Sequence, residues 1–499
     1  MKASAFFITA LISCSVFASQ TPKGDYLVKM ANETKSVTIN TLTARLPKGT
    51  KVQDLNVAGW VHVKLSDAAV AAKNGSLVSE AKETILRQPG VLAIQPNYRI
   101  KLLEDFRIKD PAQRAKLLKD TALRAQAAGD VPPDNPAIPR NGSGGSGNDP
   151  EFSNQWGMNQ IGVKEGWKMT KGTPDVVVAV IDTGVDYTHE DLVDNLWRNP
   201  GEMGTDANGK DKSTNGIDDD GNGYKDDVIG WDFASKDNKP FDLPVSIWDM
   251  LTSGGNPGHG THCAGNVAAR SDNGKGIAGV APNIKIMSLR FITEKGQGTT
   301  ADAISAIKYA TAMGAKVTSN SWGSEGEEAG DPENQALRDV IQDAQNNGVL
   351  FIAAAGNGHN GNGYNNDTDS KPGYPASYDH DIIISVAALD EAGALGSFSN
   401  WGARTVDLGA PGVKVFSTMV SNKYSDKVID FAGMTVYWDG TSMATPHVAG
   451  AAALYWSAHP EKTWQQVKSA ILTSVKRTNT MNGKSTSGGA LDVGNLMRM

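Results

Sequence analysis

Residues 176–184 read VVVAVIDTG, and this segment is the main evidence for the fold. It has six apolar residues followed by an aspartate. A strand with one face in water alternates apolar and polar residues, whereas this run is apolar at every position. It therefore predicts a strand buried on both faces, as in a parallel sheet covered by helices. Asp182 follows the run, and such sheets carry their reactive groups at the carboxyl ends of the strands. Taken alone, Asp-Thr-Gly is more often a hydrogen-bonded turn.

The same pattern continues downstream of this strand. Strand-like runs occur at residues 285–289, 316–319, 349–353 and 382–386, and helix-like segments at 301–313, 334–346 and 443–458. Alternation of this kind is typical of a parallel sheet with helices on both faces. We therefore expect residues 149–499 to form one α/β domain with a mainly parallel sheet.

A smaller unit precedes this domain. Residues 26–28, 60–63 and 91–94 read as strands and residues 80–87 as a helix, so we expect a compact α+β domain within residues 19–101. Residues 102–148 include VPPDNP and NGSGGSG, a density of Pro, Gly and Ser that predicts a flexible, protease-accessible linker. We place the maturation cleavage in that linker.

Residues 1–18 carry Lys2 and then a short apolar run that ends in Val-Phe-Ala. This pattern predicts a secretory signal peptide cleaved near Ala18. An alternative is that residues 11–14, Leu-Ile-Ser-Cys, act as a lipobox, in which case Cys14 would be lipidated and the protein anchored to a membrane. Both readings predict export, so we expect a secreted, periplasmic or extracellular protein.

The amino-acid composition excludes several kinds of protein. The chain has 499 residues, of which 39% are hydrophobic and 21% charged, and this excludes an integral membrane protein and a mostly disordered one. The net charge of −7 argues against nucleic acid as a partner. Two cysteines, at 14 and 263, cannot form a disulfide framework. We expect a soluble, monomeric protein with more than one folding unit.

Two further clusters could carry chemistry together with Asp182. His259 lies in NPGHGTHCAG, at the start of a small-residue helix, and Ser442 lies in DGTSMATPHVAG, also at a helix start, with Pro446 expected in the first turn. The ordinary alternatives are a packed core histidine and a helix-capping serine. Acyl transfer by a serine needs an imidazole to take its proton and a carboxylate to orient that imidazole. An Asp, a His and a Ser in this chain order meet that requirement.

These three blocks, DTG at 182–184, HGTH at 259–262 and GTSMATPH at 440–447, resemble the signatures of the subtilisin-like serine proteases, peptidase family S8. The resemblance implies a subtilisin-like fold and a secreted serine endopeptidase made as a self-processed zymogen. It also implies that residues 19–101 are an I9-type inhibitory propeptide that binds the enzyme intramolecularly. Residues 91–98 are similar to the final strand of such a propeptide.

The resemblance assigns roles residue by residue. Asp182 would orient the imidazole, His259 would be the general base and acid, and Ser442 the nucleophile. Asn357, after the strand-like run 349–353, matches the amide of the oxyanion hole, and His262 would have a structural role. Cys263 is similar to a buried thiol beneath the catalytic histidine in some relatives.

The peptide-binding cleft is assigned by the same comparison, to Ser321, Trp322 and Gly323 on one side and to Gly296, Gln297 and Gly298 on the other. A substrate would lie between them as an added strand, which gives broad specificity for proteins and peptides. Trp322 differs from the smaller aliphatic residue that the family pattern predicts at this wall.

Residues 206–227 are rich in acids, which repel one another unless they are solvated or neutralised by a cation. Asp218, Asp220 and Asn222 fit the first half of a calcium loop, with Asp226 nearby, but position twelve is Ile229, so this is not an EF-hand. We predict structural calcium here, with a solvated acidic loop as the alternative. By resemblance, Asp191 would be a ligand of a second calcium.

An alternative function without catalysis is also compatible with this sequence. The chain could be a catalytically silent, calcium-stabilised binding or adhesion protein that retains the protease scaffold. The presence of all three triad residues and of Asn357 argues against it.

Overall fold

The computed structural model describes residues 23–72, 75–104, 148–324, 334–359, 361–431 and 434–499. The predicted signal peptide, Cys14 and most of the predicted linker lie outside the described residues. Within the described residues, no helix has the length and apolar character needed to cross a bilayer.

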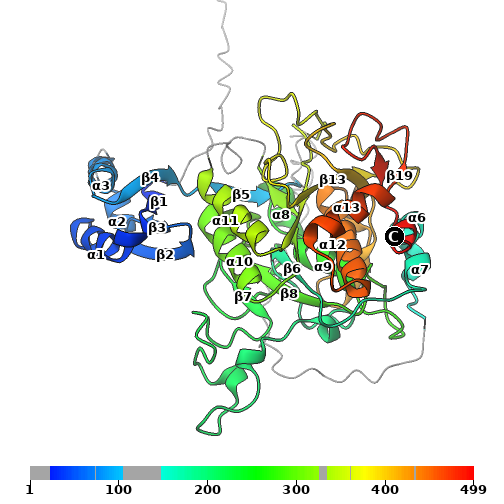
Figure 1. The fold of residues 1–499 in the computed structure, drawn as a ribbon, viewed down its shortest axis with the longest axis horizontal. Coiled ribbons are helices and arrows are strands. Elements are labelled where there is room, and N and C mark those ends of the chain that lie inside the picture. The colour runs from blue at the N-terminus through cyan, green and yellow to red at the C-terminus, as the bar shows by residue number, and fades with distance from the viewer. Residues whose placement is uncertain (1–22, 73–74, 105–147, 325–333, 360, 432–433) are drawn as a thin grey trace, which may run out of the picture.

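The N-terminal unit is a small α+β domain, shown in blue in Figure 1. Its antiparallel sheet has the order β2-β3-β1-β4. The strands are β1 (Asp25–Met30), β2 (Lys51–Val57), β3 (Trp60–Lys64) and β4 (Val91–Pro96), and the helices are α1 (Lys35–Arg45), α2 (Asp67–Val70) and α3 (Ser76–Leu86). Residues such as Val28, Leu42 and Ile85 are fully buried between sheet and helices, so the unit has its own core.

The second unit is built on a nine-stranded sheet of order β19-β20-β14-β13-β12-β10-β6-β8-β7. Every pairing is parallel except that of the edge strand β19. The strands are β6 (Val177–Asp182), β7 (Gly230–Asp232), β8 (Lys285–Arg290), β10 (Val317–Asn320), β12 (Leu350–Ala354), β13 (Ile383–Leu389), β14 (Leu408–Pro411), β19 (Lys476–Arg477) and β20 (Gly489–Ala490). The predicted α/β fold with a mainly parallel sheet is confirmed.

Helices cover both faces of this sheet. α10 and α11 lie together on one side, next to the N-terminal unit, while α9 and α12 lie together on the other (Figure 1). The large helices are α9 (His259–Ala268), α10 (Thr300–Ala312), α11 (Gln335–Asn346), α12 (Thr441–Ala458) and α13 (Trp464–Ser474). The smaller elements are α6 (Trp156–Gln160), α7 (Val163–Gly166), α8 (Ile247–Ser253), α14 (Val493–Leu496) and the hairpins β15 (Ser417–Met419) with β16 (Lys423–Ser425) and β17 (Lys427–Phe431) with β18 (Met434–Tyr437).

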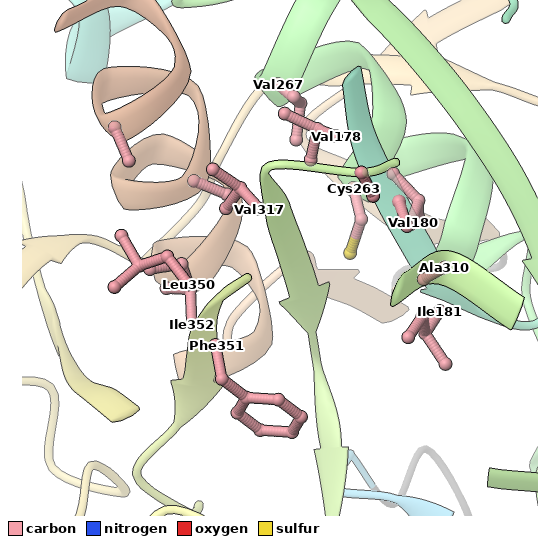
Figure 2. Packing of buried hydrophobic residues seen from close by; sticks show 14 of the residues in the cluster. Val178, Val180, Ile181, Cys263, Val267, Ala310, Val317, Leu350, Phe351 and Ile352 are labelled. Atoms are coloured by element: carbon pink, nitrogen blue, oxygen red, sulfur yellow. The ribbon is translucent and has the colours of Figure 1, made fainter. Parts of the chain in front are cut away.

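The core explains why the apolar run at 176–181 decides the fold. All six residues of β6 are buried, and Val178 and Val180 lie beside Cys263 and Val267 of α9 in Figure 2. Burial of a Val or Leu side chain contributes about 1.5–3 kcal/mol, so a strand that is apolar on both faces binds a helix layer on each side. This places Asp182 at the carboxyl edge of the sheet with its side chain fully buried.

The chain leaves the N-terminal unit as a strand of the second unit. β5 (Arg99–Leu102) lies antiparallel between β9 (Gln297–Thr299) and β11 (Trp322–Gly323). On the way it passes the N-termini of α10 and α11, where Asn97 Oδ1 accepts a hydrogen bond from Ala301 N and Gln95 Oε1 accepts one from Ala336 N. The two units are therefore joined through helix ends that would otherwise have unpaired amides.

Candidate active site

Asp182 and His259 form a direct pair. His259 Nδ1 lies 2.7 Å from Asp182 Oδ1, and both side chains are fully buried. The same oxygen accepts a hydrogen bond from Thr183 N at 2.7 Å, which fixes the carboxylate on its own backbone. Because a carboxylate only accepts, His259 donates from Nδ1, and this leaves Nε2 as the nitrogen that can take a proton.

The start of α9 sets the direction of the imidazole. His259 is the first residue of the helix, and Asn256 Oδ1 accepts from the backbone N–H groups of Gly258 and His259, at 2.9 Å each. Gly258 has φ 97°, a left-handed conformation that favours glycine. At Gly260 a Cβ atom would lie 2.1 Å from the carbonyl oxygen of Gly184, so only glycine lets the helix approach the Asp182 loop this closely.

Burial and charge act in opposite directions on His259. Burial lowers its pKa, but the adjacent charge of Asp182 raises it, and the pKa lies well above the ordinary value. Cys263 Sγ lies 3.9 Å from His259 Nδ1, and burial raises the pKa of this thiol to about 11. The thiol is therefore protonated at neutral pH and acts as a packing residue beneath the imidazole.

Ser442 is the second residue of α12 and is fully buried, so it is not the cap of the helix; Gly440 occupies that position. Its Oγ donates to the carbonyl oxygen of Ser321 at 3.2 Å. Among the described residues, His259 Nε2 has no hydrogen-bond partner. In this state the serine is therefore turned away from the base.

Pro446 lies in the second turn of α12, not in the first turn as the sequence predicted. A residue at this position would donate its N–H to the carbonyl of Ser442, four residues earlier, and proline has no N–H. That carbonyl instead accepts from Ser321 Oγ at 2.9 Å and from Cys263 Sγ at 3.6 Å. The missing helix bond thus ties the serine to Ser321, just before β11, and to α9.

Asn357 follows β12 and points its amide into the same site. Its Oδ1 accepts from Thr441 N at 2.9 Å and from Thr441 Oγ1 at 2.8 Å. With the oxygen held by two donors, Nδ2 is available as a donor beside Ser442. This orientation is the one required of an oxyanion-hole amide.

Glu104, which was not among the predicted site residues, lies beside the Asn357 amide and the His259 ring. Glu104 Oε1 accepts from Asn357 Nδ2 at 2.9 Å, and Glu104 Oε2 lies 3.3 Å from His259 Nε2. The Glu104 side chain is only 3% exposed, and a Cβ atom at Gly440 would lie 2.1 Å from its Oε1. A carboxylate of the N-terminal chain thus lies between the imidazole and the amide donor.

The six predicted cleft residues lie around the strand that leads to Glu104. Lys101 of β5 pairs with Gln297 on one side and Gly323 on the other, and Leu102 N donates to the carbonyl of Gly296. Gly298 pairs with Ile100 and Trp322 with Leu102, while the carbonyl of Ser321 accepts from Ser442 Oγ. β5 therefore lies as the central strand between these two segments, in the place where the predicted substrate strand would lie.

The indole of Trp322 packs against the core. It is fully buried, with its ring 5.1 Å from Phe291 and 6.3 Å from Phe351, each edge-on. Gly323 lies next to Leu103, the residue before Glu104. A Cβ atom at Gly323 would lie 3.5 Å from Leu103 Cδ2.

His262 lies outside the proton path. Its Nε2 lies 3.0 Å from the carbonyl of Val415, and its ring stacks on Trp438 with centroids 4.3 Å apart. Burial lowers its pKa to about 3, so the ring is neutral at any physiological pH. These contacts suit a structural histidine.

The acidic loop contains a cluster of three carboxylates. Glu202, Asp220 and Asp227 each offer an oxygen within 4.8 Å of the others; Glu202 and Asp227 are fully buried. Burial and then the nearby charge of Asp227 raise the pKa of Glu202 to about 7, and burial also raises the pKa of Asp227. Glu202 Oε2 is buried without a hydrogen-bond partner among the described residues. This donor set fits a hard divalent cation such as calcium.

Of the acids predicted here, only Asp220 belongs to this cluster. Asn222 borders it, since its Nδ2 donates to Asp220 and Asp227. Asp218 accepts from backbone amides of its own turn and Asp226 accepts from Gly216 N; their place in a calcium site stays a prediction. Glu202 was missed because it precedes the acidic run and reaches it only through the fold.

Asp191, the other predicted ligand, is in a separate place. It is fully buried, with hydrogen bonds from Asn273 Nδ2 at 2.7 Å and Ile277 N at 2.8 Å. Burial raises its pKa to about 6, and the charge of Asp149 acts in the same direction. Its role in metal binding stays a prediction.

Comparison with known proteins agrees with this geometry. Residues 173–490 match the Subtilase family, Peptidase_S8. The chain belongs to the subtilase family. Among its relatives, it is 36% identical over 300 residues to a thermophilic serine proteinase from Bacillus sp. (strain AK1), covering 60% of this chain and 57% of that protein. It is 34% identical over 308 residues to thermitase from Thermoactinomyces vulgaris, covering 62% and 84%.

A third subtilase relative extends over the N-terminal unit as well. Fervidolysin from Fervidobacterium pennivorans is 30% identical over 483 residues, covering 92% of this chain and 60% of that protein. Its crystal structure, described as that of a keratinolytic enzyme related to subtilisin, superposes with a TM-score of 0.64 at 25% identity over 96% of this chain and 61% of that chain. The chain thus spans about three fifths of the length of two of these subtilases.

Proposed function

We propose that this subtilase is a secreted serine endopeptidase that hydrolyses proteins and peptides and is made as a zymogen. The observation that carries the proposal is the convergence of a buried Asp182–His259 pair, Ser442 and the Asn357 amide on one groove that already holds a peptide strand. The serine proteinases among its relatives support the same activity. Export by the signal peptide at residues 1–18 is part of the proposal.

The proposed reaction begins when Glu104 leaves the site. Ser442 Oγ then turns from the Ser321 carbonyl to His259 Nε2 and attacks the substrate carbonyl as Nε2 takes its proton. Asp182 stabilises the imidazolium through Nδ1. The negative oxygen of the tetrahedral intermediate accepts from Asn357 Nδ2 and Ser442 N, and one such donor contributes about 3–4 kcal/mol.

The intermediate collapses as His259 gives its proton to the leaving amine, so the peptide C–N bond breaks and Ser442 carries the acyl group. Water, deprotonated by the same imidazole, then releases the acid product. The substrate is held by main-chain pairing to segments 296–298 and 321–323. Because main-chain hydrogen bonds do not depend on the substrate's side chains, specificity for the substrate sequence is broad.

The N-terminal unit would act as an intramolecular inhibitor. β5 fills the substrate groove by main-chain pairing, and Glu104 takes the amide donor that a scissile carbonyl would need. While Glu104 holds this donor, the Asn357 amide would not stabilise the oxyanion of a peptide bond being cleaved in the groove. Cleavage in the linker would come after displacement of this carboxylate.

Structural calcium is proposed at Glu202, Asp220 and Asp227. No lysine or arginine forms an ion pair with these three acids within the part of the chain that the structure describes. A bound cation would supply the missing countercharge and hold the loop between β6 and β7 against α10. Asp191 is retained as the proposed ligand of a second site.

A Ser442→Ala variant tests the proposed activity. The purified precursor should remain uncleaved and should not degrade casein, because no nucleophile remains. Precursor size is followed by mass spectrometry, with the wild-type chain as control. A variant that still matures by itself and digests casein would refute the assignment, and a wild-type chain without hydrolytic activity would favour the silent binding protein.

A Glu104→Gln variant should mature faster than the wild-type chain. The amide can still accept from Asn357 but has no charge, and a hydrogen bond to a charged group is stronger than a neutral one by about 1–1.5 kcal/mol, so we expect a precursor half-life about five- to tenfold shorter. The half-life is measured by gel densitometry. Glu83→Gln, at an exposed glutamate of the same unit, is the matched control and should not change it. An unchanged or longer half-life for Glu104→Gln counts against this role.

Chelation should lower the melting temperature of the Ser442→Ala precursor. A cation that binds only the folded state stabilises it by about 2.7 kcal/mol at 100 times its Kd. Glu202→Gln should remove most of the difference between melts with calcium and with EDTA. Asp226→Asn, which keeps an acceptor for Gly216 N, should retain it. Equal calcium dependence of the two variants would contradict the three-acid site.

A further inference from the structure

A second buried carboxylate lies next to the catalytic pair. Asp242 is in the loop between β7 and α8, sixty residues after Asp182 in the sequence, and its side chain is fully buried. It makes no ion pair among the described residues. Its four hydrogen bonds instead all come from segments that carry Asp182 or His259.

One oxygen of Asp242 binds the residues flanking the pair. Oδ1 accepts from Thr183 Oγ1 at 2.9 Å, the residue after Asp182, and from Asn256 Nδ2 at 2.6 Å, the residue that caps α9. Asn256 is thereby oriented so that its own Oδ1 accepts from Gly258 N and His259 N.

The other oxygen binds α9 itself. Oδ2 accepts from Thr261 N at 2.8 Å and from Thr261 Oγ1 at 2.7 Å, two residues after His259. Thr183 Oγ1, which donates to Asp242 Oδ1, itself accepts from Gly260 N at 2.8 Å. Every backbone N–H from Gly258 to Thr261 is thus bound by Asp242 or by a side chain that Asp242 holds.

We propose that Asp242 is a positioning residue for the reaction, which fixes the end of β6 and the first turn of α9 relative to each other so that Asp182 and His259 stay aligned. It touches neither substrate nor the reacting atoms. This inference rests on the proposed function for its kinetic consequence, but its geometric content concerns only the Asp182–His259 bond.

Charge is essential to this role. An ionised carboxylate accepts all four bonds, whereas an asparagine has one acceptor oxygen, so its NH₂ group would face either the Thr261 amide or the Asn256 amide, both of which donate. Burial raises the pKa of Asp242 to about 6, against the hydrogen bonds, which lower it. At pH 8 the group is therefore ionised and the network is complete.

The test uses the full-length Ser442→Ala precursor, which keeps the site filled and does not depend on hydrolysis. The Nδ1 proton of His259, held against a carboxylate at 2.7 Å, gives a downfield proton NMR signal at pH 8. Asp242→Asn should move this signal upfield and broaden it, because the imidazole is no longer held in one orientation. Asp182→Asn in the same background assigns the signal by removing it.

The matched control is Asp407→Asn. Asp407 precedes β14 in the other half of the sheet and accepts from Ser385 N and Thr486 Oγ1, with Lys468 Nζ 4.0 Å away, so its loss also removes hydrogen bonds of a largely buried carboxylate. It should leave the His259 signal unchanged even where it lowers the melting temperature. If Asp242→Asn folds and its signal matches that of Asp407→Asn, the proposal is overturned.

In the matured enzyme, Asp242→Asn should lower kcat by about 10- to 100-fold with KM within twofold, since misalignment affects the proton transfer but not the groove. In an Asp182→Asn background the same change should lower kcat less than threefold, because the alignment it protects is already lost. Independent, multiplicative losses would overturn the proposal.

Should Asp242→Asn fail to fold, Thr183→Val decides the matter. It removes the hydroxyl that joins Gly260 N to Asp242 at nearly constant volume. A broadened or shifted His259 signal supports the proposal, and an unchanged one overturns it. Inactive wild-type enzyme with the expected NMR results would refute the proposed function while leaving the positioning role intact.

Discussion

A fully buried carboxylate, Asp182, determines how the rest of the site is arranged. β6 is buried on both faces, so the charge of Asp182 at its end is shielded from bulk solvent. Burial of an unpaired charge is costly, and the structure offsets this cost with the Thr183 amide and the His259 imidazole. Orientation of the base is thus a consequence of satisfying the acid. The first turn of α9 has to lie where that acid is, which explains the glycine at position 260 and the capping by Asn256.

The Glu104 contact shows how the same site holds an anion. The Asn357 amide donates into the site, and a side-chain carboxylate on a tethered strand meets this donor at high local concentration. The N-terminal unit is anchored at a distance by Gln95 and Asn97 on the ends of α10 and α11. Main-chain pairing of β5 and the Glu104 carboxylate add to this anchoring, so the strand is held in the groove by several modest contacts.

Much of this could be predicted from the sequence, for identifiable reasons. The run at 176–181 is apolar at every position, which indicates burial on both faces, so the fold was predictable. The blocks around Asp182, His259 and Ser442 are local in sequence, so they could be named as candidates, and the structure brings Asp182 and His259 into contact. Their catalytic roles and those of the cleft segments stay a proposal. Glu104, Asp242 and Glu202 act through contacts between residues far apart in the chain: Glu104 meets Asn357, and Asp242 meets Thr183 and Thr261. No local pattern marks them, because a charged residue in a loop looks solvated until the fold buries it. The position of Pro446 was mispredicted for a related reason, since the free carbonyl it creates is satisfied by Ser321 and by Cys263 of α9, both far from it in the chain.

Sequence distance also explains why the three-acid cluster was not predicted as a whole. Spacing favoured Asp218, Asp220 and Asn222, which are close in the chain, whereas Glu202 and Asp227 are brought to Asp220 by the fold. Asp227 accepts hydrogen bonds from Asn199, Asn222 and Tyr309, but Glu202 Oε2 has no partner among the described residues. Burial, and then the nearby charge of Asp227, raise the pKa of Glu202 to about 7, and a cation at this cluster would lower it.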